Sequence, residues 1–198
     1  MKAVIKAILL DVEARSDTAL ASATAGKLRE PVMRLTAWAR MAKITSPANL
    51  WAFGDTSSQS TRLGQSMGRS ATVFNFFRPA YTPPASGISN AGLVAPEFQI
   101  TNEQSVVAYV NYMQALVANG TGDMKPDYAD LVAKASDSAA LVDEVNLILA
   151  AGQLGTETVT AIRAAVDSMS ATATNGPINR VGIAVLLTLA SPDFLTLR

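Results

Sequence analysis

Apolar residues recur at every third or fourth position along most of this chain, and this spacing limits the fold more than any other feature of the sequence. It is clearest in 32–42, 109–117, 159–169 and 178–190. A period near 3.6 places such residues on one face of an α-helix, whereas a half-buried strand needs strict alternation. No segment alternates for long enough to predict a strand. The sequence therefore predicts an all-α fold, an irregular bundle of about six helices.

The ends of these helices are marked by residues that favour caps and turns. We expect helices over 2–10, 28–44, 101–119, 128–135, 138–151, 156–169 and 178–190. Thr101 with Gln104 matches a capping box, and Ser138 and Thr156 are suitable N-caps for the helices that follow them. Gly120 can adopt the left-handed conformation that ends a helix.

One long stretch, 45–96, interrupts the helical period. Ser, Thr, Gly and Pro occur throughout it, as is typical of turns and loops. A loop of this length within a compact domain is uncommon, and such loops more often have a functional role than none. We expect 1–198 to form a single helical domain in which 45–96 is one long irregular segment rich in proline and aromatic residues.

The chain contains no histidine and no cysteine. This composition excludes a Ser-His-Asp triad, a cysteine nucleophile, thiol redox chemistry, Cys/His zinc sites and haem bound by His or Cys. Asp123, Asp127 and Asp130 lie close together, but they lack the alternating ligands, central Gly and closing Glu of a calcium loop. We therefore expect no metal, no cofactor and no catalytic constellation, and Asp127 is expected to cap a short helix.

Charge is unevenly distributed, because 1–78 carry +6 and 79–198 carry −6 in a chain of zero net charge. Attraction between two faces of the molecule is one interpretation, and a basic patch of Arg29, Arg40 and Lys43 for an anionic polymer is another. No Lys/Arg run is interleaved with aromatic residues, so we expect no nucleic-acid binding. The most apolar stretch is about half the length of a membrane span, so no span is expected.

The segment 73–84, VFNFFRPAYTPP, concentrates aromatic and proline residues. It contains Phe74, Phe76, Phe77 and Tyr81, on a backbone that proline biases toward extended geometry. Rigid aromatic side chains on such a backbone suit a partner's groove, although they can also pack over the helices as a lid. The leading hypothesis is a structural or interaction domain that contacts a protein partner, or the rest of a longer protein, through 73–84.

A second hypothesis places a ligand site around Arg78, Tyr81, Glu97 and Gln99. Glu97 precedes a helix N-terminus, where negative charge is favoured, and Arg78 is close enough in the sequence to pair with it. Such a pair over an aromatic floor would suit carbohydrate binding or hydrolysis. The same pair is also typical of a structural clasp.

Several segments, taken in order, resemble the C-terminal part of the bacterial family called domain of unknown function 1800. They are KAVIKAILLD (2–11), GKLREPVMRLTAWAR (26–40), LGQSMGRSATVFNFFRPAYTPP (63–84), GLVAPEFQITNEQSVVAYVNYMQ (92–114), LVDEVNLILAAGQL (141–154) and LTLASPDFLTLR (187–198). Family members are usually longer and often carry an export signal, whereas 3–10 is too short for a typical one. The resemblance implies a C-terminal portion of an exported, periplasmic or cell-surface protein. The family has no established activity that could be assigned to particular residues of this chain.

Overall fold

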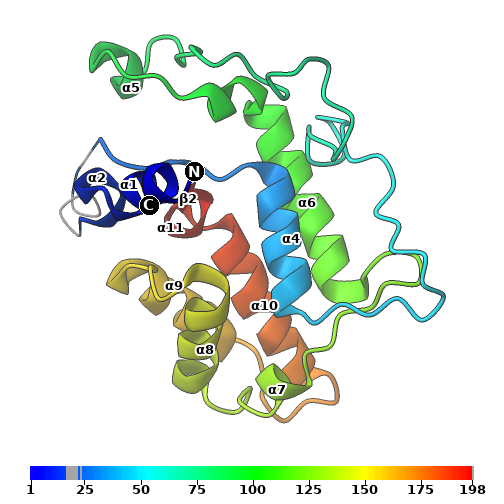
Figure 1. The fold of residues 1–198 in the computed structure, drawn as a ribbon. Coiled ribbons are helices and arrows are strands. Elements are labelled where there is room, and N and C mark those ends of the chain that lie inside the picture. Colours follow the sequence, from blue (N-terminus) through cyan, green and yellow to red (C-terminus); the bar gives the residue numbers. More distant parts are fainter. Residues whose placement is uncertain (17–21, 23, 198) are drawn as a thin grey trace.

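Helix α10 (Gly176–Ala190) lies at the centre of the helical bundle (Figure 1) in the computed structural model, which describes residues 1–16, 22 and 24–197. It packs against α6 (Glu103–Asn119) on one side and against α8 (Ser138–Ala150) and α9 (Thr156–Asp167) on the other. The predicted all-α class is confirmed.

The remaining elements are shorter or lie at the edge of this bundle. They are α1 (Lys2–Leu10), α2 (Val12–Arg15), β1 (Lys27–Leu28), α4 (Pro31–Met41), α5 (Gly87–Asn90), the 3-10 helix η1 (Pro96–Ile100), α7 (Ala129–Val132), α11 (Pro192–Leu195) and β2 (Thr196–Leu197). Between α4 and η1 the chain runs as a long irregular loop around one side of the bundle, with α5 as a single short helix (Figure 1).

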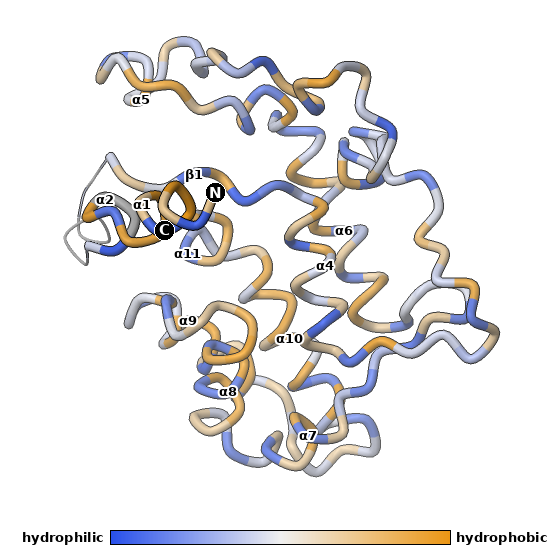
Figure 2. Tube along the Cα trace, viewed as in Figure 1, coloured by the Kyte–Doolittle hydropathy of each residue, from blue (hydrophilic) through white to orange (hydrophobic). Residues whose placement is uncertain are grey.

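The helical period of apolar residues explains why α10 is central. Val181, Val185 and Leu189 follow one another at intervals of four and are all fully buried. Residues with this spacing lie on one stripe of a helix, and their burial supplies the main favourable free energy of folding. Figure 2 shows α10 as apolar along most of its length, whereas much of the irregular loop is polar.

A chain of buried hydrogen bonds joins three parts of the fold. Trp38 of α4 is fully buried, and its Nε1 donates to the Tyr128 hydroxyl at 2.9 Å. That hydroxyl in turn donates to the carbonyl of Val117 in α6 at 3.2 Å. Burial raises the pKa of Tyr128 to about 12, so its hydroxyl stays protonated and can donate at neutral pH.

Several predicted helix ends differ from those observed. Asn102, and not Thr101, is the N-cap of α6, and it forms a reciprocal capping box with Ser105. Asp137 caps α8 in place of Ser138, and Gly155 precedes α9 without a side-chain cap. The observed cap lies one residue after the predicted one at α6 and one residue before it at α8 and α9. Neighbouring polar residues can satisfy the same orphan N–H groups, so the spacing alone does not decide between them.

Three apolar residues within the predicted helices lie outside the core. Leu28 is not helical but pairs with Thr196 in the two-residue β1–β2 ladder, although no strand was expected. Val106 lies in α6 and Ile148 in α8, yet both are exposed. The segment 16–26, between the first two predicted helices, lies largely outside the described residues.

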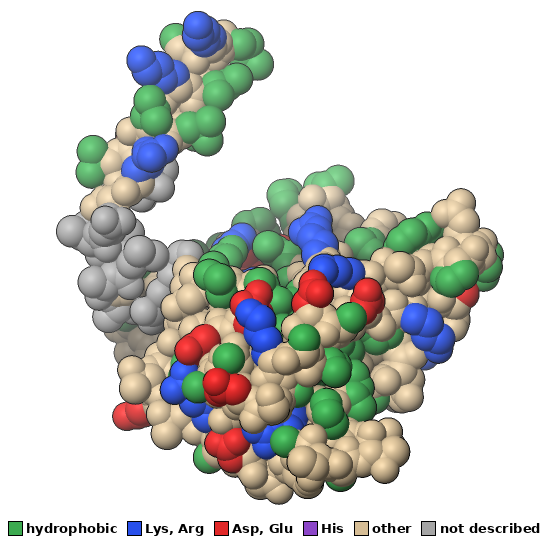
Figure 3. Space-filling view, turned by 90° about the horizontal axis from the view of Figure 1, so that it is seen from below, with side chains coloured by type: hydrophobic (Ala, Val, Ile, Leu, Met, Phe, Trp, Pro, Cys, Tyr) green, Lys and Arg blue, Asp and Glu red, His purple; other side chains and the backbone are tan. Residues whose placement is uncertain are grey.

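Helix α1 stands away from the rest of the molecule, and none of its residues is buried. Its apolar side chains, including Ile5, Ile8 and Leu9, are each more than half exposed. Figure 3 shows this projecting arm, in which apolar side chains lie beside basic ones. None of the helices in the described part of the chain is long and apolar enough to cross a membrane.

Arg180 of α10 is a buried charge that binds two other segments of the chain, the one before α8 and the end of α9. Its Nε donates to the carbonyl of Ala135 at 2.6 Å, and its Nη1 donates to those of Val166 and Met169 at 2.9 and 2.7 Å. Its Nη2 donates to the Asp167 carboxylate at 2.9 Å. The planar guanidinium thus satisfies carbonyls at the end of α9 and before α8, which an apolar side chain would leave unpaired.

We predict that Arg180→Met lowers the free energy of unfolding by about 3–5 kcal/mol, because it leaves buried carbonyls without donors. Urea denaturation measures this loss. Arg163→Met is the matched control, since Arg163 pairs with Asp143 near the surface. Its loss should stay below about 1 kcal/mol. Equal losses in the two variants would contradict this account of Arg180.

Candidate interaction site

Three side chains that are far apart in the sequence form a hydrogen-bonded cluster, which we call the polar clasp: Glu30, Gln65 and Asn75. The Gln65 amide nitrogen donates to Glu30 Oε2 at 2.5 Å and to Asn75 Oδ1 at 3.2 Å. The Asn75 amide nitrogen donates to the same Glu30 oxygen at 2.8 Å. The clasp therefore fixes two points of the irregular loop to the residue that precedes α4.

Gln65 also satisfies the start of α4. Its side-chain oxygen accepts from the backbone N–H of Val32 at 3.2 Å, whereas the N-cap residue, Glu30, makes no side-chain cap bond. Gln65 is only 1% exposed, so these bonds are shielded from water. The carboxylate of Glu30 lies beside the positive end of the helix dipole, which favours its charge.

Asn75 holds a tight turn at the beginning of the 73–84 segment. Its φ of +70° lies in the left-handed region, which Asn tolerates better than most residues. Thr72 and Asn75 form an isolated bridge across this turn, and the Phe76 N–H donates to Asn75 Oδ1 at 2.9 Å. The turn presents Val73 and Phe74 to solvent, 94% and 60% exposed.

The other predicted contact residues are held in different ways. Phe76, Phe77 and Tyr81 are half-buried, whereas Arg78 is exposed. The backbone N–H of Arg78 donates to Gln99 Oε1 at 2.7 Å, so Gln99 supports the segment from η1.

Glu97 is buried, but it does not pair with Arg78. Its carboxylate lies 4.0 Å from the ammonium of Lys27 in β1. No hydrogen bond or ion pair joins the side chains of Arg78, Tyr81 and Glu97 in the described structure. The expected Arg78–Glu97 pair is therefore absent, because β1 brings a nearer cation to Glu97.

The predicted basic patch is divided in the structure. Arg29 precedes α4 and stacks over the ring of Phe194, with 4.3 Å between the guanidinium carbon and the ring centroid. Lys43 pairs with Asp130, and this pairing lowers the pKa of the Asp130 carboxyl. Only Arg40 of the three is both exposed and on α4. The three side chains therefore do not form one continuous row.

The three aspartates considered as metal ligands have separate partners. Asp123 accepts from the Ser46 hydroxyl at 2.5 Å, a hydrogen bond that lowers the pKa of its carboxyl. Asp127 accepts from the N–H of Ala129 at the start of α7, close to the cap role expected of it. Among the described residues, no group of three or more acidic side chains is placed to hold a metal ion.

Comparison with known proteins establishes the family. The family described as "Protein of unknown function (DUF1800)" matches residues 1–196. The chain belongs to the DUF1800 family. Searches of curated proteins and of solved structures found no match. No activity is transferred to the DUF1800 chain by similarity, so its function has to be argued from its own geometry.

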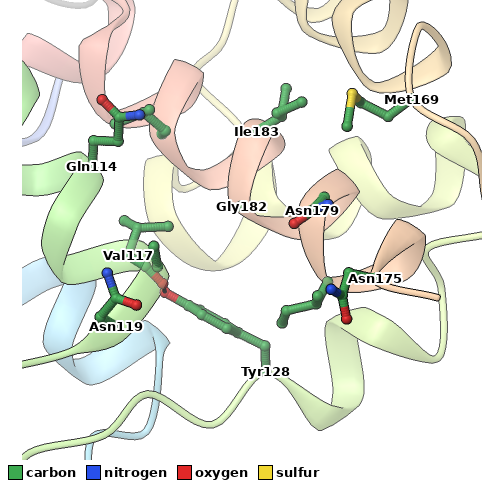
Figure 4. Close-up of a pocket in the computed structure, with 12 residues that line it drawn as sticks. Gln114, Val117, Asn119, Tyr128, Met169, Asn175, Asn179, Gly182 and Ile183 are labelled. Atoms are coloured by element: carbon green, nitrogen blue, oxygen red, sulfur yellow. Dashed lines mark hydrogen bonds between the residues drawn. The ribbon is translucent and has the colours of Figure 1, made fainter. Parts of the chain in front are cut away.

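The DUF1800 chain also has a groove between α6 and α10 with a volume of about 490 Å³. Figure 4 shows the amides of Gln114 and Asn119 on one side and those of Asn175 and Asn179 on the other, above Tyr128. Tyr128 is the one ionisable residue in this lining, and its hydroxyl is already bonded to Trp38 and Val117. The groove therefore offers hydrogen-bonding surface without acid or base groups.

The clasp was not predicted from the sequence. Its members are separated by 35 and 10 residues, and no local pattern links Gln65 to Glu30. One signal was present: Asn75 interrupts an aromatic run, and Asn is the residue type, after Gly, that most readily takes positive φ.

We predict that Asn75→Gly lowers the free energy of unfolding by about 2 kcal/mol, because it removes hydrogen bonds to a carboxylate while keeping the left-handed backbone accessible. Asn75→Ala should cost about 0.5–1 kcal/mol more, since it adds backbone strain. Chemical denaturation measures both variants. Asn49→Gly is the control, because Asn49 also has positive φ (55°) but lies on the exposed surface. An Asn75→Ala variant as stable as Asn75→Gly would argue against the strained turn.

Proposed function

We propose that this DUF1800 chain is an interaction domain that binds a protein partner, or another part of a longer protein, through 73–84. The observation that carries the proposal is the exposure of Val73 and Phe74 at the end of a turn that the polar clasp fixes. Exposed apolar side chains on mobile loops are common, but here the turn is held by part-buried hydrogen bonds. A pre-ordered apolar tip loses little conformational entropy when it binds.

The half-buried residues of the segment support the same function. Phe76 and Phe77 follow the tip, and the Gln99 amide fixes the backbone at Arg78. Further along, the Ala95 N–H donates to the Tyr81 carbonyl at 2.8 Å. The segment is thus attached at both ends, and a partner that takes Phe74 in an apolar pocket would also meet Arg78 at the rim. Buried aromatic anchors surrounded by polar rims are the usual form of a binding hot spot.

The apolar face of α1 is a second observation in favour of partner binding. Its large apolar side chains remain exposed, and an unpartnered amphipathic helix is unstable on its own at this length. A helix of nine residues gains most of its stability from a surface that covers its apolar face. We therefore propose α1 as a further part of the contact surface. No observation favours a hydrolytic function around Arg78, Tyr81 and Glu97.

A photo-crosslinking amino acid at position 74 tests the proposal. We expect it to yield a discrete adduct in cells of the source organism, and mass spectrometry would identify the cross-linked peptide. The same amino acid at position 60, where an exposed serine stands in the irregular loop, is the control. If the two positions give the same adducts or none, 73–84 is not the contact surface.

Once the partner is known, we predict that Phe74→Asp weakens its binding at least about 30-fold, the loss typical of a hot-spot residue. The variant should unfold within about 0.5 kcal/mol of the natural chain, since Phe74 is largely exposed. Val94→Asp is the matched control, because Val94 is also 60% exposed in the irregular loop but lies outside 73–84. Calorimetric titration would measure both, and an equal loss for Val94→Asp would remove the assignment to Phe74.

A further inference from the structure

Arg34 of α4 is a buried cation without a counter-charge. It is 5% exposed, and it forms no ion pair with any carboxylate in the described part of the chain. Its Nε donates to the Arg29 carbonyl at 2.7 Å, and its guanidinium carbon lies 4.9 Å from the centroid of the Tyr109 ring. These contacts hold the side chain in place, but none of them neutralises it.

The surroundings make this charge more costly still. Burial lowers the pKa of Arg34, and the nearby cation of Arg29 lowers it as well, while Tyr109 acts in the opposite direction. Arg29 also has a buried Nε without a hydrogen-bond partner. A buried charge is normally paired, because leaving it unpaired costs several kcal/mol of desolvation. The arrangement is therefore incomplete unless an anion is present.

A small pocket of about 80 Å³ lies against Arg34. Arg34 and Tyr109 line it, together with the hydroxyl-bearing Thr101 and Ser105. Its other walls are apolar: Leu28, Pro31, Leu63, Ile100, Val106, Val110, Ala190 and Leu195. The pocket thus combines one cation with an apolar wall, because the Thr101 and Ser105 hydroxyls already donate to the carbonyls of Glu97 and Asn102.

Two helix N-termini meet at the same pocket. Pro31 is the first residue of α4, and Ser105 lies in the first turn of α6. Figure 1 shows both helices beginning at the same end of the bundle. Carboxylates of the chain already lie near both N-termini, Glu30 at α4 and Glu103 in the first turn of α6, so the case for a bound anion rests on Arg34 itself.

We propose that this pocket binds a carboxylate group of about acetate size, with the carboxylate on Arg34 and the carbon chain against the apolar wall. Arginine binds carboxylates in bidentate geometry, so one guanidinium suffices for one monoanion. A phosphate dianion fits less well, because the apolar wall offers no donors for its remaining oxygens. A cavity of about 150 Å³ holds one benzene molecule. By proportion, a pocket of about 80 Å³ has room for about three or four non-hydrogen atoms.

The carboxylate can come from a free short-chain acid or from an acidic side chain of a partner, which ends in the same group. This inference does not depend on the function proposed for 73–84. It assigns a separate site, at the N-termini of α4 and α6.

Thermal denaturation with added acetate at constant ionic strength tests the site. At about 100 times a millimolar Kd, the Tm should rise by about 5 °C or more. Arg34→Met should abolish this rise, because it removes the guanidinium that recognises the anion. The rise should also fade as the pH drops through the pKa of acetic acid, since Arg34 recognises the anion.

Arg62→Met is the matched control for Arg34→Met. Arg62 also lies 4.9 Å over a tyrosine ring, that of Tyr112, but it does not line this pocket. This variant should keep the full response to acetate. Acetamide, which has the same shape without the charge, should give no response with any variant.

If Arg34→Met does not fold, NMR spectroscopy of the natural chain provides a second test. In the natural chain, acetate should shift the backbone NMR signals of Ser105 and Tyr109 more than those of residues in α9. N-acetylglutamate amide binding more tightly than acetate would identify a partner's side chain as the source. No shift with either compound, an equal Tm rise in Arg34→Met, or an equal response to acetamide would overturn the proposal.

Discussion

The burial of Gln65 against the first turn of α4 is the contact on which the irregular part of the chain depends. Backbone hydrogen bonds of regular structure are sparse between α4 and η1, so the path of this loop has to be fixed by side chains. Gln65 does this with both ends of its amide, accepting from Val32 and donating to Glu30 and Asn75. Because the buried amide of Gln65 would otherwise lack partners, the loop and the helix stabilise each other.

The sequence was not sufficient to predict the short helices α2, α5, η1 and α11, but it was sufficient to predict the long ones. Their apolar stripes repeat with a period that only an α-helix satisfies, and burial of α10 among α6, α8 and α9 follows from its nearly continuous apolar composition. Val106 and Ile148 show the limit of this reasoning, since both are exposed. An apolar stripe indicates which face of a helix is buried, but not how much of that face a neighbouring helix covers. Caps were misplaced by one residue because several adjacent side chains could serve.

The non-local contacts could not be predicted, and the candidate sites consist mainly of them. The short ladder at Leu28, the Lys27–Glu97 pair and the polar clasp all join residues that the sequence places far apart. Charge counting was similarly incomplete. It identified a basic N-terminal part, but two of its arginines lie against aromatic rings, Arg34 buried and Arg29 partly buried. Which aromatic ring an arginine contacts depends on the tertiary fold, and the spacing of residues in the sequence does not predict it.

The pairing of β1 with β2 has a topological consequence. Lys27 stands opposite Leu197, and opposed residues in an antiparallel ladder have Cα atoms only about 5 Å apart. The path from 27 to 197 therefore begins and finishes at nearly the same point in space. A polypeptide unit of this kind can be spliced into a surface turn of a host protein without forcing the flanking chain apart. Residues 27 and 197 can also be joined by a short linker, with new chain termini introduced in the irregular loop, which gives a circular permutant.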